Sequence, residues 1–321
     1  MLSRSETQEG RTRAGVLAAG ACYLMWGLVP LYWKQLKAVD PIELIAHRHL
    51  WSMVILLLLL GRWGGWSDVR AVLASRSGIG RVLLGAGLLT ANWLVYVWGV
   101  NTGHIVETSL GYFLVPLFSV LAGRFLLGEH LRRLQWTAVG LAAGGVAVLM
   151  LQATRVPWIA LMLAGTWGCY SILRKRATLG AVSGLAVETL LLSPLALGYL
   201  IWRQRDGTGV LGRADLTTHL LVLSSGVVTA VPLLLFAHAA PRIRLSTLGL
   251  LQYIAPTAQL MLGVWVYGES FSRSRLASFG LIWSGLVLYT LDNLSAQRRA
   301  TMTREGEVKG GPSPGVRPGR E

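Results

Sequence analysis

Charged residues are scarce in this sequence. Asp, Glu, Lys and Arg make up 14% of its 321 residues, whereas 53% are hydrophobic and the mean hydropathy is +0.52. A soluble globule of this size needs more polar residues to cover its surface. The composition therefore excludes a soluble domain and indicates a protein whose solvent is lipid.

Cysteines and catalytic motifs are also lacking. The two cysteines, Cys22 and Cys169, both lie in apolar runs, which argues against a disulfide framework or a zinc site. The sequence contains no G-x4-G-K-[ST] phosphate loop, no H-E-x2-H zinc motif and no G-x-S-x-G elbow. We therefore expect no metal, no cofactor and no enzymatic activity.

The net charge of +15 is a feature shared with nucleic-acid-binding proteins. Here, however, the Lys and Arg residues stand between apolar runs and not on one face, which is how membrane proteins fix their orientation. The partner indicated by the charge is a lipid bilayer, and no nucleic acid is expected.

Apolar runs of the length needed to cross a bilayer, about 20 residues, recur along the chain. They predict an all-α membrane protein with ten transmembrane helices. The first five helices are expected at about 14–33, 43–61, 82–101, 105–127 and 134–151, and the other five at about 157–173, 184–202, 217–240, 245–267 and 276–291. The first run has no small-residue cleavage pattern, so we expect it to be retained.

The tails and loops set the expected orientation. Placing the N-terminus inside assigns 21 of the 30 Lys and Arg residues to the cytoplasmic side. Positive charge resists translocation, so both termini are predicted to be cytoplasmic, in a multi-pass protein of the inner (plasma) membrane. Residues 1–13 form the N-terminal tail, and residues 292–321, rich in charge, Gly and Pro, are predicted to be a disordered basic tail.

The two halves of the sequence resemble each other. At an offset of 140, eight identities occur in the 34 positions from 116 to 149, among them an ungapped P-x11-G-E that places Pro116 opposite Pro256 and Glu129 opposite Glu269. Because each half holds five helices, the second half enters the membrane from the opposite side. Inverted repeats of this kind are typical of secondary transporters, with the substrate site near the midplane between the repeats.

Several strings also resemble a known family. They are YLMWGLVPLYWK, the AHR-x2-WS stretch at 46–52, NWLVYVWGVNTGHIVETSLGYFLVP at 92–116 and RLSTLGLLQYIAPT at 244–257. Through them, the chain between about 14 and 291 is similar to the RarD group of EamA-type transporters in the drug/metabolite transporter superfamily. The resemblance implies a permease with two inverted five-helix EamA repeats, at 14–151 and 157–291.

Polar side chains inside the membrane are candidates for the site, because burying them in lipid is costly. In the helix at 43–61, Glu43, His47 and Trp51 share one face with Arg48 beside it. His47 and Arg48 are cavity candidates, for contact with solute or for proton relay. A cluster at the membrane interface, with Arg48 snorkelling, is the alternative.

In the helix at 82–101, Asn92 and Tyr96 share a face with Gly99. A buried Asn needs hydrogen-bond partners, which a neighbouring helix or a ligand supplies. Trp26 and Trp167, which are equivalent in the repeat, lie in mid-helix and are expected in a cavity wall; a belt at the membrane interface is the alternative.

A further stripe repeats in both halves at spacings i, i+4, i+7 and i+11. It consists of Tyr112, Pro116, Ser119 and Gly123 in the first half and of Gln252, Pro256, Gln259 and Gly263 in the second. We expect Tyr112, Gln252, Tyr253 and Gln259 to line the cavity, and Pro116, Pro256, Gly123 and Gly263 to serve gating or packing. Close packing of the two faces through their glycines is the alternative.

The small-residue pairs Gly140/Gly144 and Gly280/Ser284 allow close helix contact and are expected to serve packing only. Glu188 and Glu107 stand near helix starts, where an acid is stabilised by the helix dipole, so we expect them to cap these helices. A role in proton coupling is the alternative, and it would require these acids to be buried.

These features together predict a secondary transporter of small metabolites or drug-like solutes that works by alternating access. A proton is the candidate coupling ion. The alternatives are an integral membrane enzyme, against which the missing motifs argue, and a non-transporting sensor or scaffold, which would not require an inverted repeat.

Overall fold

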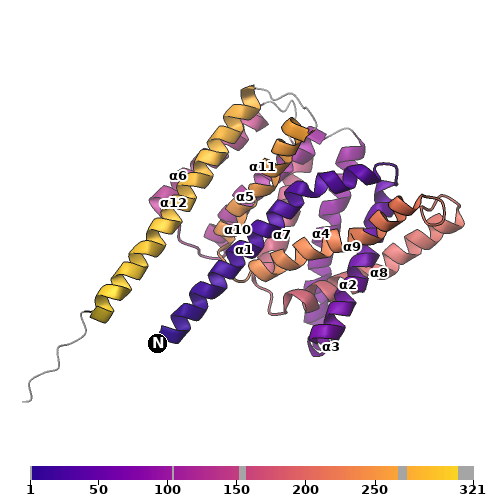
Figure 1. Ribbon diagram of the computed structural model, residues 1–321, viewed down its shortest axis with the longest axis horizontal. Coiled ribbons are helices and arrows are strands. Elements are labelled where there is room, and N and C mark those ends of the chain that lie inside the picture. Colours follow the sequence, from indigo (N-terminus) through magenta and orange to yellow (C-terminus); the bar gives the residue numbers. More distant parts are fainter. Residues whose placement is uncertain (1, 103–104, 152–156, 267–272, 310–321) are drawn as a thin grey trace, which may run out of the picture.

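The computed structural model describes residues 2–102, 105–151, 157–266 and 273–309, and within these ranges the chain consists of helices and short connections (Figure 1). The elements of the first half are α1 (Leu2–Trp33), the short η1 (Lys34–Leu36), α2 (Pro41–Trp63), α3 (Trp66–Leu73), α4 (Arg76–Asn101), α5 (Ile105–Leu126) and α6 (Arg133–Met150). Those of the second half are α7 (Trp158–Lys175), α8 (Ala181–Arg205), α9 (Leu216–Ala239), α10 (Leu245–Leu251), α11 (Ile254–Met261), the π-helical turn η2 (Leu262–Val266) and α12 (Arg273–Lys309).

The predicted apolar runs all contain helices. In the described part of the chain, α1, α2, α4, α6, α8 and α9 each hold a segment long and apolar enough to cross a membrane. Shorter apolar segments, Leu110–Leu126 in α5 and Leu276–Asp292 in α12, accompany them. The fold is therefore all-helical and multi-spanning.

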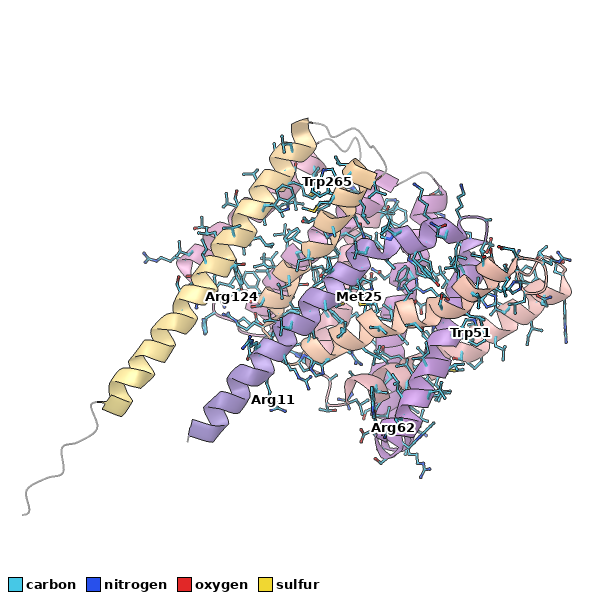
Figure 2. The ribbon with its side chains drawn as sticks, viewed as in Figure 1. Arg11, Met25, Trp51, Arg62, Arg124 and Trp265 are labelled. Carbon is cyan, nitrogen blue, oxygen red and sulfur yellow. The ribbon has the colours of Figure 1, made fainter. Side chains whose placement is uncertain are left out.

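The outer surface of the bundle carries many large apolar side chains. Leu17, Leu58, Phe125 and Leu195 each expose between 66% and 73% of their surface. A soluble protein rarely leaves so much apolar surface in water, so this surface faces lipid. Figure 2 shows Arg11 and Arg62 towards the end of the bundle where the N-terminus lies, and Trp265 towards the other end.

The helix predicted at 245–267 is broken. It forms α10, a turn at Gln252 and Tyr253, α11 and then η2. Pro256 has no N–H to donate to the carbonyl of Gln252, and that carbonyl instead accepts from the N–H of Ala255 at 3.1 Å. The turn places the amide of Gln252 at the junction of two short helices.

Both terminal tails are helical where they are described, which corrects the predicted boundaries. α1 already begins at Leu2, and α12 continues through the predicted disordered tail to Lys309. The stretch 296–309 is rich in Ala, Gln, Arg, Met, Glu and Lys, which favour helix and extend the apolar part of α12. The free ends of α1 and α12 lie on the same side of the molecule (Figure 1).

A short amphipathic helix, α3, was not predicted. It follows α2 directly because Gly64 and Gly65 adopt positive φ values of 80° and 109°, which side chains disfavour. Val69 is its buried residue. The connection between α2 and α4 thus lies along the surface of the bundle.

Helices of the first half pack against helices of the second. The pairs include α2 with α8, α6 with α12 and α5 with α10. In addition, α1 contacts α9 and α11, and α7 contacts α4 and α5. Among the described residues, the core consists of two large clusters, one around α1, α7 and α9 and one around α5, α6 and α12, and a small third one formed by Leu36, Val39 and Val222.

Glycines set the closest approach of α6 and α12, but not the glycines that were predicted. A Cβ atom on Gly145 would lie 2.6 Å from the carbonyl oxygen of Ser278, and one on Gly285 would lie 2.5 Å from that of Ala138. At Gly140 and Gly280 a Cβ atom would meet open space. Of the predicted small pairs, Gly140 and Gly280 thus lie away from the contact, whereas a Cβ atom on Gly144 would lie 3.9 Å from the side chain of Leu281, at an ordinary contact distance.

Candidate functional site

A cavity of about 730 Å³ lies between the two halves of the chain. Its wall comes from α1, α2, α4 and α5 on one side and from α7, α9 and the α10–α11 segment on the other. At one end it reaches Lys34 and Pro41, at the connection between α1 and α2, and at the other it reaches Tyr23 and Trp167. The volume is in the range of small-molecule sites.

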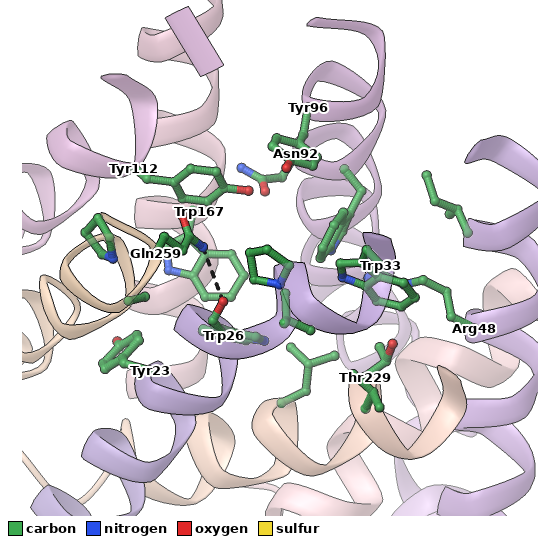
Figure 3. Close-up of a pocket in the computed structure, with 18 of the residues that line it drawn as sticks. Tyr23, Trp26, Trp33, Arg48, Asn92, Tyr96, Tyr112, Trp167, Thr229 and Gln259 are labelled. Carbon is green, nitrogen blue, oxygen red and sulfur yellow. Dashed lines mark hydrogen bonds between the residues drawn. The ribbon is translucent and has the colours of Figure 1, made fainter. Parts of the chain in front are cut away.

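The cavity brings together most of the residues that the sequence pattern grouped. Those that line it are Trp26, Arg48, Asn92, Tyr96, Tyr112, Trp167, Gln252, Pro256 and Gln259. Figure 3 shows Arg48 and Trp33 at one end of the cavity and Trp26, Trp167 and Gln259 at the other. Residues from six helical segments, α1, α2, α4, α5, α7 and α10–α11, thus converge on one space.

Two predicted cavity residues do not line it. His47 precedes Arg48 and so points about 100° away around α2, with its Nε2 3.9 Å from an oxygen of Glu43. Tyr253 follows Gln252 in the turn and is fully buried on the opposite side, where its hydroxyl donates to the carbonyl of Phe113 at 3.2 Å.

Pro116 and Gly123 lie outside the described cavity wall. The carbonyl of Pro116 would lie 2.9 Å from a Cβ atom on Gly249, so α5 and α10 meet closely here. Gly123 approaches Glu129, whose oxygen would be 2.8 Å from its Cβ. Gly263 lies in η2.

Tyr23, Trp33, Lys34 and Thr229 line the cavity but were not predicted. Tyr23 and Trp33 stand three residues before and seven residues after Trp26, on the same face of α1. That spacing was the signal available. Thr229 begins a Thr-Ala pair that also occurs in the first half, as Thr90-Ala91, and this recurrence was the signal available for it.

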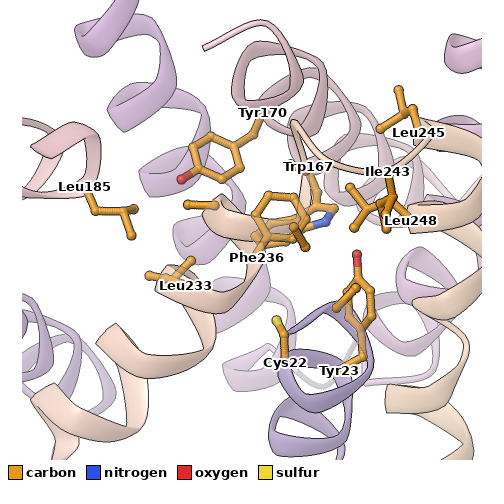
Figure 4. Packing of buried hydrophobic residues seen from close by; sticks show 14 of the residues in the cluster. Cys22, Tyr23, Trp167, Tyr170, Leu185, Leu233, Phe236, Ile243, Leu245 and Leu248 are labelled. Atoms are coloured by element: carbon orange, nitrogen blue, oxygen red, sulfur yellow. The ribbon is translucent and has the colours of Figure 1, made fainter. Parts of the chain in front are cut away.

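Aromatic rings close the cavity at its inner end. The ring of Trp26 meets that of Trp167 edge-on, with centroids 5.1 Å apart, and Phe236 lies 5.2 Å from Trp167. Tyr170 stacks on Phe236 at an interplanar angle of 15°. Figure 4 shows this cluster together with Cys22 and Tyr23 on α1. The cluster separates the cavity from the end of the bundle that carries the N-terminus.

Polar side chains in the wall bind neighbouring helices as well. The amide nitrogen of Asn92 donates to the carbonyl of Leu163 at 3.0 Å and to the hydroxyl of Thr166 at 2.9 Å, which joins α4 to α7. The amide of Gln259 donates to the carbonyl of Trp26 at 3.2 Å, as Figure 3 marks, which joins α11 to α1. Asn92 therefore has the interhelical role considered above and also borders the cavity.

Arg48 supplies positive charge inside the wall. Its guanidinium carbon lies 3.6 Å from the ring centroid of Trp93 and 5.8 Å from that of Trp33. The residue is 7% exposed. Stacking on an indole face stabilises a cation that has left bulk water.

Glu188 is not a helix cap. It is the eighth residue of α8, beyond the first turn, and it is buried. Its carboxylate accepts from the hydroxyl of Tyr170 at 3.1 Å and pairs with Arg174 at 3.3 Å. This ion pair lies behind the aromatic cluster and joins α7 to α8.

Glu43 also lies outside the cavity. Its carboxylate pairs with Arg203 at 3.2 Å and accepts from the backbone N–H of Val210 at 2.6 Å. The side chain ties α2 to the connection between α8 and α9.

Glu129 of the P-x11-G-E motif binds the start of α10. One oxygen accepts from the N–H of Leu245 at 2.6 Å, and the other accepts from the N–H and hydroxyl of Ser246 at 3.0 and 2.7 Å. Nearby, Lys175 donates to the carbonyl of Ile243. The contacts of Glu129 hold the two halves together at the end of the bundle that carries the N-terminus.

Within the described ranges, no group of three or more His, Cys, Asp or Glu side chains comes together as metal ligands would. The cavity wall is instead aromatic, amide-bearing and cationic. Such a wall is suited to binding a solute through ring faces and hydrogen bonds.

Comparison with known proteins adds to this picture. Residues 13–151 match the EamA-like transporter family. The chain is similar to a protein named RarD from Streptomyces exfoliatus, at 43% identity over 91% of this chain and 93% of that protein. It is similar at 42% identity to the uncharacterized transporter YojE of Bacillus subtilis, over 91% of this chain and 98% of that one, and at 38% to RarD of Escherichia coli, with the same coverage. A solved crystal structure aligns with a TM-score of 0.66 at 22% identity, over 87% of this chain and 97% of that one, which shows a shared fold.

Proposed function

The chain belongs to the EamA-like transporter family, in the RarD group of the drug/metabolite transporter superfamily, and we propose that it carries a small organic solute across the cell membrane by alternating access. Its role as a transporter follows from the family. Secondary transport, the inverted repeat and the location of the site are the parts that we propose.

The observation that carries the proposal is a cavity between the two halves that is lined at one end by a loop and closed at the other by packed side chains. The connection between α1 and α2 borders the first end, and the aromatic cluster around Trp167 and Phe236 forms the other. With the N-terminus in the cytoplasm, as the charge distribution predicts, the cavity faces outward. The structure then corresponds to one of the two states that alternating access requires.

Contacts related by the offset of 140 support an inverted repeat. Gly145 meets the carbonyl of Ser278, and Gly285 meets that of Ala138, so each contact is the counterpart of the other. The packed pairs of helices follow the same relation. In the repeat, α7 is equivalent to α1 and α9 is equivalent to α4, so the pair α7–α4 is the counterpart of the pair α1–α9. We propose repeats at 14–151 and 157–291 on these grounds.

In the reverse state the contacts at the closed end would have to separate. The candidates are the bonds from Glu129 to Leu245 and Ser246, and the approach of Gly15 to Arg242. A Cβ atom on Gly15 would lie 2.8 Å from the Cβ of Arg242. A small adjustment brings this pair into the range of a disulfide, in which the Cβ atoms are about 3.8 Å apart.

Proteoliposomes test the proposal. The protein with Gly15→Cys and Arg242→Cys, in a background in which Cys22 and Cys169 are Ala, is reconstituted into vesicles filled with a small-molecule extract of cells. We expect protein-dependent release of at least one solute under reducing conditions, loss of release on oxidation and recovery with dithiothreitol. Chemical conversion without net movement would indicate an enzyme, and release that persists after complete cross-linking would rule out alternating access through this end.

A further inference from the structure

Resting on the proposed transport function, we propose that the solute is an organic anion with a planar apolar body, such as an aryl carboxylate, and that Arg48 binds its anionic group. The inference comes from the charge of the cavity, from the unused donors of Arg48 and from the aromatic wall.

The described wall of the cavity is positively charged. It contains Arg48 and Lys34 and no Asp or Glu, and the inference rests on Arg48. The acids nearest in sequence already have other partners. Asp40 accepts from the N–H groups of Ile42 and Glu43 at the start of α2, and Glu43 pairs with Arg203.

Arg48 differs from the other arginines inside the bundle. Arg174 is 4% exposed and pairs with Glu188, and the side chain of Arg203 is 19% exposed and pairs with Glu43. Arg48 is 7% exposed, yet in the described structure its guanidinium has neither a carboxylate nor a hydrogen-bond acceptor. An arginine at membrane depth normally pairs or faces a wet cavity. This one faces the cavity.

Stacking leaves the donors of Arg48 available. The guanidinium carbon lies over the Trp93 ring, 3.6 Å from its centroid, and a contact with the ring face does not use the N–H groups, which lie in the plane of the guanidinium and point to its edges. A planar guanidinium offers two parallel donors to a carboxylate, which is the geometry that favours bidentate binding. Trp93 thus positions the guanidinium of Arg48 so that its free N–H groups can bind the anionic group of a solute.

The rest of the wall suits an apolar planar body. The ring of Tyr96 meets Tyr112 edge-on at 5.7 Å, and Trp26 meets Trp167 at 5.1 Å. Ring faces and edges of this kind favour aromatic partners. Gln259 lies at the far end of the cavity from Arg48, where its amide group suits an uncharged polar substituent (Figure 3).

This charge distribution discriminates among solutes of one shape. An ammonium group would meet Arg48 or the aromatic wall without a described carboxylate to receive it. A zwitterionic amino acid is therefore expected to bind less well than the matching anion, because its ammonium loses water and gains no partner.

Calorimetry on the full chain in nanodiscs tests the proposal with four probes of matched size: phenylpropionate, phenylpropanamide, phenylpropylamine and phenylalanine. A charge-assisted hydrogen-bond pair should favour the anion over the amide by about 10- to 100-fold in affinity. Arg48→Gln should remove that preference and leave amide binding within about twofold. Arg62→Gln, a change of an exposed arginine on the same helix, should leave all four affinities unchanged.

A second variant covers the case in which Arg48→Gln fails to fold. Arg48→Lys keeps the charge and loses the planar fork, so it should fold and retain a reduced preference for the anion. Equal affinity for anion, amide and amine, or no binding of phenylpropionate, overturns the proposal, and so does an unchanged anion preference in Arg48→Gln.

Flux separates this inference from the proposed function. Anion binding that depends on Arg48, without any solute movement in proteoliposomes, would leave the anion site standing and overturn the transport proposal. Protein-dependent movement of the amine, without anion binding, would support the transport proposal and overturn the anion site.

Discussion

Removing the carboxylate of Glu129 should open the closed end of the bundle. In Glu129→Ala, the N–H groups of Leu245 and Ser246 lose an acceptor at 2.6 and 3.0 Å, and the hydroxyl of Ser246 loses one at 2.7 Å. Hydrogen bonds to a charged group contribute about 1.5–3 kcal/mol each. The total loss is smaller than the sum of three such bonds, because water that enters this end forms replacement hydrogen bonds and because the energies of neighbouring bonds are not additive. We take the loss as roughly 2–3 kcal/mol. The balance between the two proposed states then shifts about 30- to 150-fold towards the state open at this end.

The thiol of Cys22 measures that shift. Cys22 is fully buried on α1, in the aromatic cluster that closes the cavity, whereas Cys169 is exposed. With Cys169→Ala as background, alkylation by N-ethylmaleimide reports access to Cys22 alone. We expect Glu129→Ala to raise the alkylation rate by at least tenfold, and Asp206→Asn, a change at an exposed residue between α8 and α9, to leave it unchanged.

An unchanged rate in a variant whose thermal unfolding matches the parent would refute the reasoning. It would show that the bonds to Glu129 do not limit opening. A raised rate together with a large loss of thermal stability would point to unfolding, and circular dichroism at the labelling temperature separates the two results.

Three further predictions concern the cavity and the packing. Arg48→Ala or Tyr112→Ala should abolish transport while the protein remains folded in the membrane; normal proteoliposome flux in both would remove these residues from the site. Gly145→Leu should destabilise the fold by about 1–3 kcal/mol, because its Cβ would lie 2.6 Å from a backbone carbonyl, whereas Gly140→Leu should change the unfolding midpoint little, since its Cβ meets open space. Glu188→Gln should cost about 3–5 kcal/mol of stability by leaving a buried arginine unpaired, and replacing that arginine with Met as well should recover most of the loss in the same thermal assay.

The sequence was sufficient to predict where the helices lie, because lipid imposes long apolar runs and such a run can be recognised without knowing what packs against it. It was not sufficient to predict the break at Gln252. Pro116 and Pro256 occupy equivalent positions, yet α5 continues through Pro116. Tertiary packing decides which of two similar prolines lies in a broken helix, and the local sequence pattern carries no information about that packing.

The residues of the candidate site were also only partly predictable from the sequence. Helical periodicity placed Tyr112 and Gln252 on faces that do border the cavity. It could not separate Arg48 from His47, because one residue step on α2 decides between the cavity and the far side. That these side chains bind a solute stays a prediction.

The proposed inverted repeat extends the argument about Glu129 to the proposed opposite state. Its counterpart at the offset of 140 is Glu269, which lies outside the described residues, and the counterparts of Leu245 and Ser246 are Ile105 and Val106. If the halves exchange conformations, Glu269 should stabilise the state in which the cavity opens to the side of the N-terminus.

Glu269→Ala should therefore act in the direction opposite to Glu129→Ala and slow the alkylation of Cys22 below the rate of the parent. Because the two changes act on opposite sides of one equilibrium, the double variant should return towards the parent rate. Two acids in equivalent positions that both raise the rate when removed would be inconsistent with an exchange of conformations between inverted halves. They would instead act as independent structural supports, and the symmetry of the contacts between α6 and α12 would then reflect shared ancestry of the halves without a shared gating role.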